Sequence, residues 1–309
     1  MHFFFCLSVY ISMEKFVRAE IARCLPEGVL SEISRVALAS GVRKDEINEI
    51  RLRVCSAASI TCRGENFLLD VVLSKKDISD LVTKLCRGSL YAYGESVRRG
   101  YIALDGGIRV GVCGALSADG RALCEITSVN IRVPHIIRGV SGKALEFCTR
   151  GGQLQSTLIY SPPGGGKTTL LRDMASQLAK RYRVALIDTR SELWIPEMFS
   201  GTMCDALVGY AKAEGIEIAT RTLSPELIVC DEIGDTDEAR QILSAAMAGV
   251  PIIASAHASS VSELISRQGI RLLHDEGVFS GYIGIRRERI NGRPTRSYIF
   301  DFSLREEME

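Results

Sequence analysis

A glycine-rich run near the middle of the chain has the residue types of a phosphate-binding loop. It comprises Ser161, Pro162, Pro163, Gly164, Gly165, Gly166, Lys167, Thr168 and Thr169, between a predicted strand and a predicted helix. Glycines let backbone N–H groups turn inward around a phosphate, and the helix N-terminus adds a positive dipole. Lys167 would then reach the β- and γ-phosphates, and the Thr168 hydroxyl would coordinate Mg²⁺. The pattern matches GxxxxGK[ST] except that Ser161 replaces the first glycine, and a plain glycine-rich turn is the alternative.

A pair of acids at the end of a predicted buried strand is the second candidate. Four apolar residues lead directly into Asp231 and Glu232. Asp231 would hold Mg²⁺ through water, and Glu232 would act as the general base on an attacking water. The alternative is a strand that ends in two solvated acids. We expect the strand at 252–256 to lie between this strand and the one before the loop, with Ser255 or His257 facing the γ-phosphate as a sensor.

Other charged residues follow the remaining strand ends. Asp188 and Glu192 come after the strand predicted at 183–188, and this edge lines the ligand crevice in open α/β sheets. In the functional interpretation Asp188 is a metal ligand and both acids join the metal or water network; in the structural one they cap a helix. Arg221 precedes the acidic strand and is either a catalytic arginine at a nucleotide interface or an ordinary surface arginine.

Arginines gather in the first part of the chain, several of them within strand-like runs: Arg51, Arg53, Arg98, Arg99, Arg109 and Arg132. One interpretation is a set of exposed hydrophilic strand faces. A second is that they act in trans on the γ-phosphate of a neighbouring subunit and stabilise transition-state charge. A third is a nucleic-acid patch, which the lack of interleaved aromatic residues disfavours.

Periodicity divides these candidates between two domains. Helices at 14–40 and 75–99 and strands within 47–73 and 100–133 indicate an α+β domain. Beyond residue 140, strands at 157–160, 183–188, 227–231 and 252–256 alternate with helices at 167–180, 192–199, 205–222, 236–248 and 260–275, and 282–302 closes as a hairpin. This alternation predicts an α/β fold with a mostly parallel sheet. We therefore expect an extra N-terminal segment at 1–12, an α+β domain at 13–140 and an α/β domain at 141–309.

Composition excludes several classes of protein. The chain has 309 residues, 46% apolar and 24% charged, so disordered and fibrous classes are excluded. The net charge of +1 gives no general attraction to nucleic acid. The 10 cysteines form no CxxC pair and are typical of free thiols in a reducing cytosol. The mean hydropathy of +0.12 indicates either surfaces that are buried against partners or a large core.

The N-terminus is apolar for about a dozen residues but is too short to span a bilayer and lacks a basic region. We interpret Met13 as the true start; a weak membrane-touching segment is the alternative. No other stretch is apolar enough for a transmembrane helix, so the sequence predicts no membrane span.

Motifs along nearly the whole chain resemble one family, that of stage III sporulation protein AA. They are Glu49–Arg53, Arg98–Ile102, Gly107–Gly111, Ser128–Arg132, the phosphate loop with Thr168–Asp173, Lys212–Gly215, Ser224–Gly234 and Ala256–Ala258. The sequence departs from the family pattern at Ser161, at Thr189, where a second acid is usual, and in the extra residues 1–12.

The resemblance implies a RecA-like P-loop ATPase domain behind an α+β domain, similar to the ATPases of type II and IV secretion and pilus machines. It also implies ATP and Mg²⁺ as cofactors, a hexameric ring, and membrane channel proteins of the sporulation apparatus as partners. The expected location is the mother-cell cytoplasm, peripherally at the membrane, where the ring would power a secretion-like channel to the forespore. Two alternatives stay open: a nucleic-acid-dependent P-loop ATPase, and a non-hydrolysing scaffold gated by nucleotide.

Overall fold

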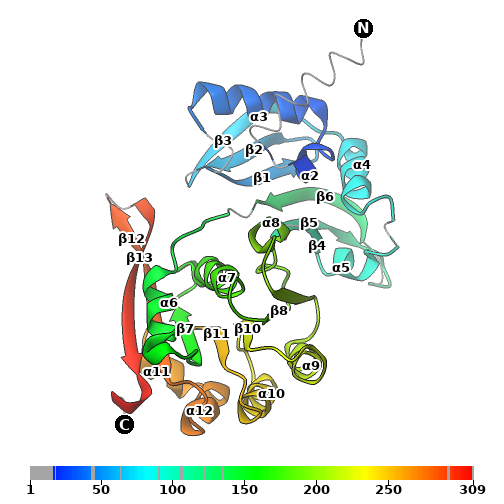
Figure 1. Ribbon diagram of the computed structural model, residues 1–309. Coiled ribbons are helices and arrows are strands. Elements are labelled where there is room, and N and C mark those ends of the chain that lie inside the picture. The colour runs from blue at the N-terminus through cyan, green and yellow to red at the C-terminus, as the bar shows by residue number, and fades with distance from the viewer. Residues whose placement is uncertain are drawn as a thin grey trace. The chain divides into compact units, whose positions relative to one another are not determined.

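The protein folds into two compact units. The computed structural model describes residues 17, 19–42, 46–62, 64–89, 91–104, 107–120, 123–133, 136–290 and 293–307 (Figure 1). The first unit ends at Ile136 and the second begins at Ile137. The segment 1–12 and the start at Met13 lie outside the described residues. In these ranges none of the helices combines the length and the apolarity that a membrane crossing requires.

The first unit is built on an antiparallel sheet of order β3-β2-β1-β6-β5-β4. Its strands are β1 (Ile47–Arg53), β2 (Ala57–Cys62), β3 (Glu65–Val72), β4 (Tyr101–Leu104), β5 (Ile108–Leu116) and β6 (Leu123–Arg132). Its helices are α2 (Ala19–Ala22), α3 (Glu27–Ala39), α4 (Lys75–Leu85) and α5 (Gly94–Arg98). The expected α+β character is thus present, although the helix predicted at 75–99 is interrupted after Leu85.

Strand alternation gives this sheet one apolar and one polar face. Ile50, Leu52 and Ile131 are buried in one core together with apolar residues of α3 and α4. Because neighbouring residues of a strand point to opposite faces, Arg51 and Arg132 lie on the other face.

The second unit contains a sheet of order β13-β12-β7-β11-β10-β8-β9. Its strands are β7 (Thr157–Ser161), β8 (Val184–Asp188), β9 (Cys204–Val208), β10 (Leu227–Glu232), β11 (Ile252–His257), β12 (Gly281–Ile290) and β13 (Arg293–Leu304). Neighbouring strands run parallel, except that β13 is antiparallel to β12. The fold class expected from the sequence is therefore confirmed, and β11 lies between β7 and β10 as predicted.

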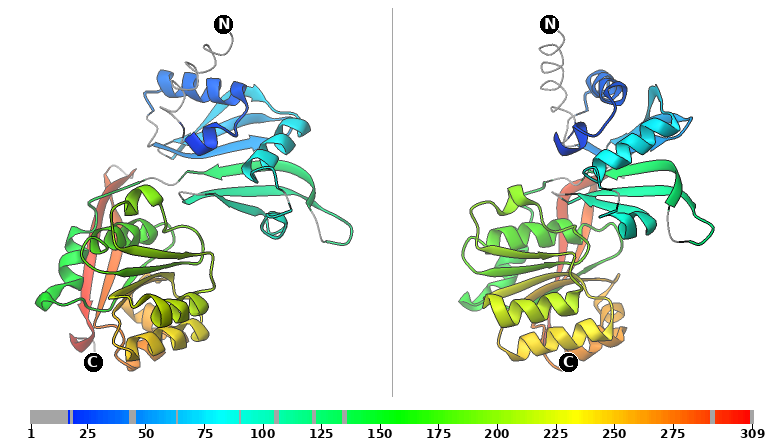
Figure 2. Two further views of the ribbon diagram at one scale, coloured as in Figure 1. Left: turned by 45° about the vertical axis from the view of Figure 1, so that its right-hand side comes forward. Right: turned by 90° about the vertical axis from the view of Figure 1, so that its right-hand side faces the viewer.

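Helices cover both faces of this sheet (Figures 1 and 2). They are α6 (Gly142–Cys148), α7 (Lys167–Leu178), α8 (Pro196–Phe199), α9 (Lys212–Ile218), α10 (Thr236–Met247), α11 (Val261–Ser266) and α12 (Gln268–Asp275), with a π-helix, η4, at Ala219–Leu223 and short 3₁₀ turns, η3 at Arg150–Gly152 and η5 at Arg305–Glu307. Alternate residues of the strands belong to two separate hydrophobic cores. Ile159 and Val229 pack with α7, and Leu158 and Ile228 pack with α10. The buried strands read as continuous apolar runs for this reason.

Two sequence predictions in this unit were wrong. Residues 205–222 are not one helix, because Cys204–Val208 forms the edge strand β9 along β8, and α9 begins only at Lys212. An edge strand is only partly buried, so it lacks the continuous apolar run that marked the inner strands. The helix predicted at 192–199 is likewise reduced to α8.

Candidate functional site

The glycine-rich run forms a tight loop between β7 and α7. Gly164 and Gly166 have φ angles of +76° and +97°, a left-handed region that favours glycine. At Gly165 a Cβ atom would lie 2.3 Å from Oγ of Ser161, so no larger residue fits there. The loop therefore needs these three glycines to pass from the strand into the helix N-terminus, which is the geometry of a phosphate-binding loop.

The ammonium of Lys167 lies inside this loop. Nζ donates to the carbonyl oxygen of Ser161 at 3.1 Å, lies 3.4 Å from the Ser161 hydroxyl and is 2.7 Å from Nδ1 of His257. Burial lowers the pKa of Lys167 to about 8, although Glu232 opposes that shift. The serine that replaces the usual glycine thus places a hydroxyl beside the lysine in addition to the backbone carbonyl.

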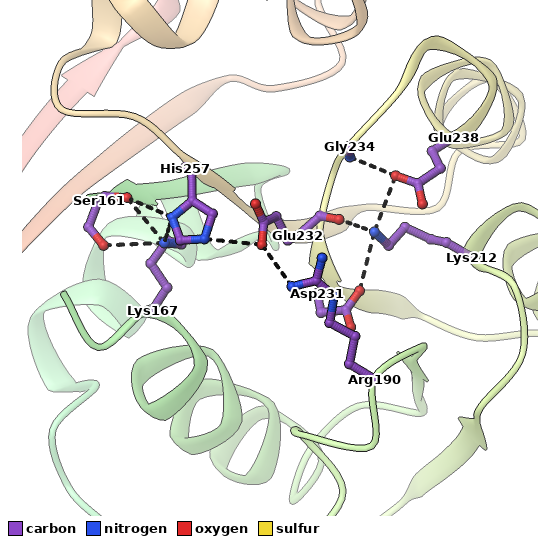
Figure 3. A network of polar contacts seen from close by, with 9 residues as sticks. All are labelled: Ser161, Lys167, Arg190, Lys212, Asp231, Glu232, Gly234, Glu238 and His257. Atoms are coloured by element: carbon purple, nitrogen blue, oxygen red, sulfur yellow. Dashed lines mark hydrogen bonds and ion pairs between the residues drawn. The ribbon is translucent and has the colours of Figure 1, made fainter. Parts of the chain in front are cut away.

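Glu232 lies at the other end of a short polar chain (Figure 3). Its Oε2 is 3.2 Å from Nε2 of His257 and 3.3 Å from the Arg190 guanidinium. Strand β11 brings His257 between the loop lysine and the acid because it lies between β7 and β10. The arrangement links the loop lysine, Lys167, through one imidazole to the carboxylate of Glu232.

Asp231 is buried beside Glu232. Its Oδ1 lies 3.2 Å from Nζ of Lys212, whereas its Oδ2 has no hydrogen-bond partner among the described residues. Burial raises the pKa of Asp231 to about 6; Lys212 opposes this shift and Asp188 adds to it. An unpartnered buried carboxylate oxygen fits a Mg²⁺ ion or a water bound to one.

The described residues contain no cluster of three or more His, Cys, Asp or Glu that would hold a metal ion alone. Magnesium commonly takes only one or two carboxylates and completes its coordination with substrate phosphates and water. Asp231 together with the Thr168 hydroxyl suits that mode of binding.

Asp188 is fully buried and its carboxylate is occupied by backbone. Oδ1 accepts from the N–H of Glu192 at 2.8 Å, and Oδ2 accepts from the N–H groups of Leu193 at 2.9 Å and Trp194 at 2.8 Å. These contacts favour the structural alternative over direct metal ligation. Asp188 fixes the loop that carries Arg190, and through it supports the position of Glu232.

A cavity of about 280 Å³ joins these groups. It is lined by Gly164, Gly166, Lys167, Thr168, Thr169, Leu171, Arg190, Glu192, Leu193, Asp231, Glu232, Ser255, His257 and Arg287. Most residues that the sequence assigned to a nucleotide site therefore meet at one place. Ser161 and Pro162 line a neighbouring cavity next to the hairpin β12–β13.

The hairpin β12–β13 contributes two residues that sequence reasoning missed. Arg287 lines the cavity, and its partner across the hairpin, Tyr298, donates a hydrogen bond to the carbonyl oxygen of Gly166 at 3.2 Å. The Tyr298 hydroxyl lies 2.5 Å from the place where a Cβ of Gly166 would be. The hairpin pairs with β7 in the sheet, and no local pattern in the sequence indicates that long-range contact.

Arg221 does not join this site in its own subunit. It lies on η4, pairs with Glu217 at 2.7 Å and has a side chain that is 75% exposed. It lines a separate depression beside α10. The catalytic role within the same chain is therefore not supported by the geometry.

The arginines of the first unit lie mostly on the polar face of its sheet. Arg132 pairs across the strands with both Arg109 and Glu49. Arg51 forms an ion pair with Glu49, and Arg109 lies over the Tyr101 ring at 5.7 Å from its centroid. Arg53 belongs to the same face of β1, and Arg98 and Arg99 lie at the end of α5.

Comparison with known proteins identifies relatives along most of the chain. The family model described as "Sporulation stage III, protein AA" matches residues 18–301. Stage III sporulation protein AA of Bacillus subtilis (strain 168) is 33% identical over 296 residues, which cover 91% of this chain and 94% of that protein. Competence protein ComGA of Streptococcus pneumoniae (strain ATCC BAA-255 / R6) is 28% identical over 36% of this chain and 34% of its own length.

Solved structures share the fold. The Legionella pneumophila ATPase DotB superposes with a TM-score of 0.64 at 14% identity, covering 91% of this chain and 82% of DotB. The pilus retraction motor PilT with bound ADP gives a TM-score of 0.64 at 18% identity, covering 88% and 82% of the two chains. At these identities the similarity establishes the architecture of the fold.

Proposed function

Because the chain belongs to the sporulation stage III protein AA family, related to secretion and pilus ATPases, we propose that it is a Mg²⁺-dependent ATPase that powers a secretion-like channel between mother cell and forespore. The proposal rests on one observation: a single cavity beside the glycine-rich loop is lined by Lys167, Thr168, Asp231 and Glu232. This combination supplies a phosphate cradle, metal ligands and a general base in one place.

ATP binding rests on the loop and the start of α7. Backbone N–H groups of 164–169 and the helix dipole favour the phosphates, and Lys167 exchanges its contact with His257 for phosphate oxygens. Arg190 and Arg287 add positive charge on the cavity wall. Thr168 and Asp231 would hold Mg²⁺, which when bound neutralises charge on the β- and γ-phosphates.

Glu232 is the group that takes the proton from the attacking water. Its Oε2 is oriented by His257 on one side and Arg190 on the other. Either the buried Ser255 or His257, which ends β11, senses the γ-phosphate; both line the cavity. Water activation by Glu232 is the step on which hydrolysis depends.

Two variants test this assignment. Glu232→Gln should bind ATP like the wild type but hydrolyse it about 10²- to 10⁴-fold more slowly, which is the usual effect of losing a general base. Lys167→Ala should lose ATP binding itself. The exposed residues Glu146 and Lys180 provide the controls Glu146→Gln and Lys180→Ala, which should change neither property. Wild-type hydrolysis by Glu232→Gln, or tight ATP binding by Lys167→Ala, would contradict the assignment.

We further propose that the protein works as a homo-oligomeric ring, hexameric as the family resemblance implies. Arginines on the polar face of the first unit, such as Arg109 and Arg132, would complete the site of a neighbouring subunit, so hydrolysis would require assembly. Channel proteins of the sporulation apparatus would hold the ring at the membrane from the mother-cell cytoplasm. The mass of the assembly and the ATPase rate per subunit, both measured against protein concentration, should rise together. Full activity of a monomer would exclude a role of these arginines in the site of a neighbouring subunit.

A further inference from the structure

Lys212 is a buried lysine at the start of α9, and all of its partners lie around the acidic end of β10 (Figure 3). Its side chain is 3% exposed, with Nζ 3.2 Å from Oδ1 of Asp231 and 3.3 Å from Oε2 of Glu238. The ammonium also donates to the main-chain carbonyl oxygen of Glu232. A buried ammonium is costly unless it is paired, and this one has an acceptor for each of its three protons.

The partners of Lys212 hold the whole segment that carries the acids. Glu238, on the first turn of α10, accepts from Lys212 and from the backbone N–H of Gly234 at 2.7 Å. Lys212 itself contacts the side chain of Asp231 and the backbone of Glu232. The chain from Asp231 to Gly234 is therefore fixed from one side by a single ion-pair network.

This network determines which oxygen of Asp231 remains open. Oδ1 faces Lys212, and Oδ2 has no partner among the residues that the structure describes. Asp231 and Glu232 line the cavity, and Lys212 is not among its lining residues. Lys212 can therefore affect the cavity only indirectly, through its contacts with Asp231 and Glu232.

We propose that Lys212 is a positioning residue for the metal site and the general base: with Glu238 as its anchor, it orients the Asp231 carboxylate and the Glu232 main chain. The inference rests on the proposed nucleotide site and assigns a role to a residue outside it. The competing explanation is that Lys212 serves only to neutralise the charge of Glu238, whose side chain is 22% exposed. The two explanations differ in what happens when Lys212 and Glu238 are removed together.

The test compares ATP affinity with and without Mg²⁺, in a Glu232→Gln background that prevents hydrolysis. Lys212→Met should leave the affinity measured in EDTA unchanged but reduce the gain produced by Mg²⁺ by about 10- to 100-fold, as for other groups that orient metal ligands. With Glu232 intact, the same change should lower kcat and leave the EDTA affinity as it was. Lys180→Met removes an exposed lysine and should have no effect.

The double variant Lys212→Met/Glu238→Gln separates the two explanations. It removes the Glu238 charge that Lys212→Met leaves without its lysine partner, so it also serves if Lys212→Met fails to fold. A positioning role predicts that the Mg²⁺-dependent gain stays reduced in the double variant, and recovery of the wild-type gain overturns the proposal. Lys212→Arg keeps the charge but cannot match the same three acceptors, so it should also lose part of the gain.

Failure of the proposed function would look different. A wild-type protein that binds no ATP, with or without Mg²⁺, would contradict the nucleotide site itself. A wild-type protein that binds Mg²⁺-ATP normally, beside a Lys212→Met variant that does the same, would contradict only the role of Lys212.

Discussion

Nζ of Lys167 lies 2.7 Å from Nδ1 of His257. A protonated ammonium only donates, so Nδ1 accepts and the histidine carries its proton on Nε2, facing Oε2 of Glu232 at 3.2 Å. The 2.7 Å contact with Lys167 decides the tautomer over the carbonyl oxygen of Ser161, which lies 3.3 Å from the same Nδ1. The lysine that would bind phosphate is therefore connected through one imidazole to the carboxylate that would activate water. If a phosphate drew Lys167 away from His257, the contact of His257 with Glu232 would change as well.

Replacement of His257 should remove the link between Glu232, the proposed general base, and Lys167 of the glycine-rich loop. In His257→Ala, Glu232 keeps its contact with Arg190 but loses its contact with the imidazole, so we expect kcat to fall by about 100-fold, the typical cost of a catalytic group misplaced by about 1 Å. ATP affinity should change little. Single-turnover hydrolysis with parallel ATP binding measures both, and His257→Gln, which keeps a donor and an acceptor, should recover part of the rate. An unchanged rate in His257→Ala would exclude the coupling.

Lys167 should make ATP binding depend on pH. Burial lowers its pKa to about 8, and phosphate oxygens raise it again by favouring the charged form. Above pH 8 the free protein must therefore take up a proton when it binds ATP, and the affinity should fall by up to about tenfold per pH unit. Between pH 8 and the range near pH 6 in which Asp231 takes up a proton, the ammonium is already charged and the affinity should be flat.

Calorimetric titration of ATP across this range measures the effect. Lys167→Arg is the matched control, because its guanidinium stays charged and should give no such slope. Equal slopes in the two proteins would assign the pH dependence to another group.

The sequence predicted the parts of the site that are formed by residues close together in the chain. Loop, helix and acidic strand are contiguous motifs, and the place of β11 between β7 and β10 follows from the adjacent acids of Asp231 and Glu232. The role of Asp188 was left open because its partners are backbone groups, and the path of a loop is not encoded in residue spacing. The contacts of Arg287 and Tyr298 depend on hairpin pairing across more than 100 residues, which no local pattern contains.

Arg287 should contribute to the binding of phosphates. It lines the cavity, whereas its neighbour Arg286 faces the other side of β12 and lines a different cavity. Arg287→Ala should weaken ATP binding about tenfold or more, since a hydrogen bond to a charged group contributes about 1.5–3 kcal/mol. Arg286→Ala is the control and should leave the affinity unchanged. Equilibrium binding of ATP, ADP and AMP checks the assignment, because a loss that is equal for AMP would mean that Arg287 does not act on the outer phosphates.

Asp173 ties the beginning of the second unit to the helix after the phosphate loop. It is fully buried on α7 and accepts from the backbone N–H groups of Gly139 at 3.1 Å, Val140 at 2.8 Å and Ser141 at 2.9 Å, and from the Ser141 hydroxyl at 2.7 Å. The contacts hold residues 139–141 on α7, inside the unit that begins at Ile137.

Asp173→Asn should therefore destabilise the second unit. The amide replaces one acceptor oxygen by a donor that faces backbone N–H groups, and leaving buried donors unsatisfied costs about 1–3 kcal/mol. Trp194 is the only tryptophan of the chain and lies in the second unit, so its fluorescence during urea unfolding reports this unit. The control Asp237→Asn removes a carboxylate that is 82% exposed and pairs with Arg240, which should change the unfolding free energy by about 0.5 kcal/mol or less. If both variants unfolded at the wild-type urea concentration, the buried carboxylate would not be what holds residues 139–141 on α7.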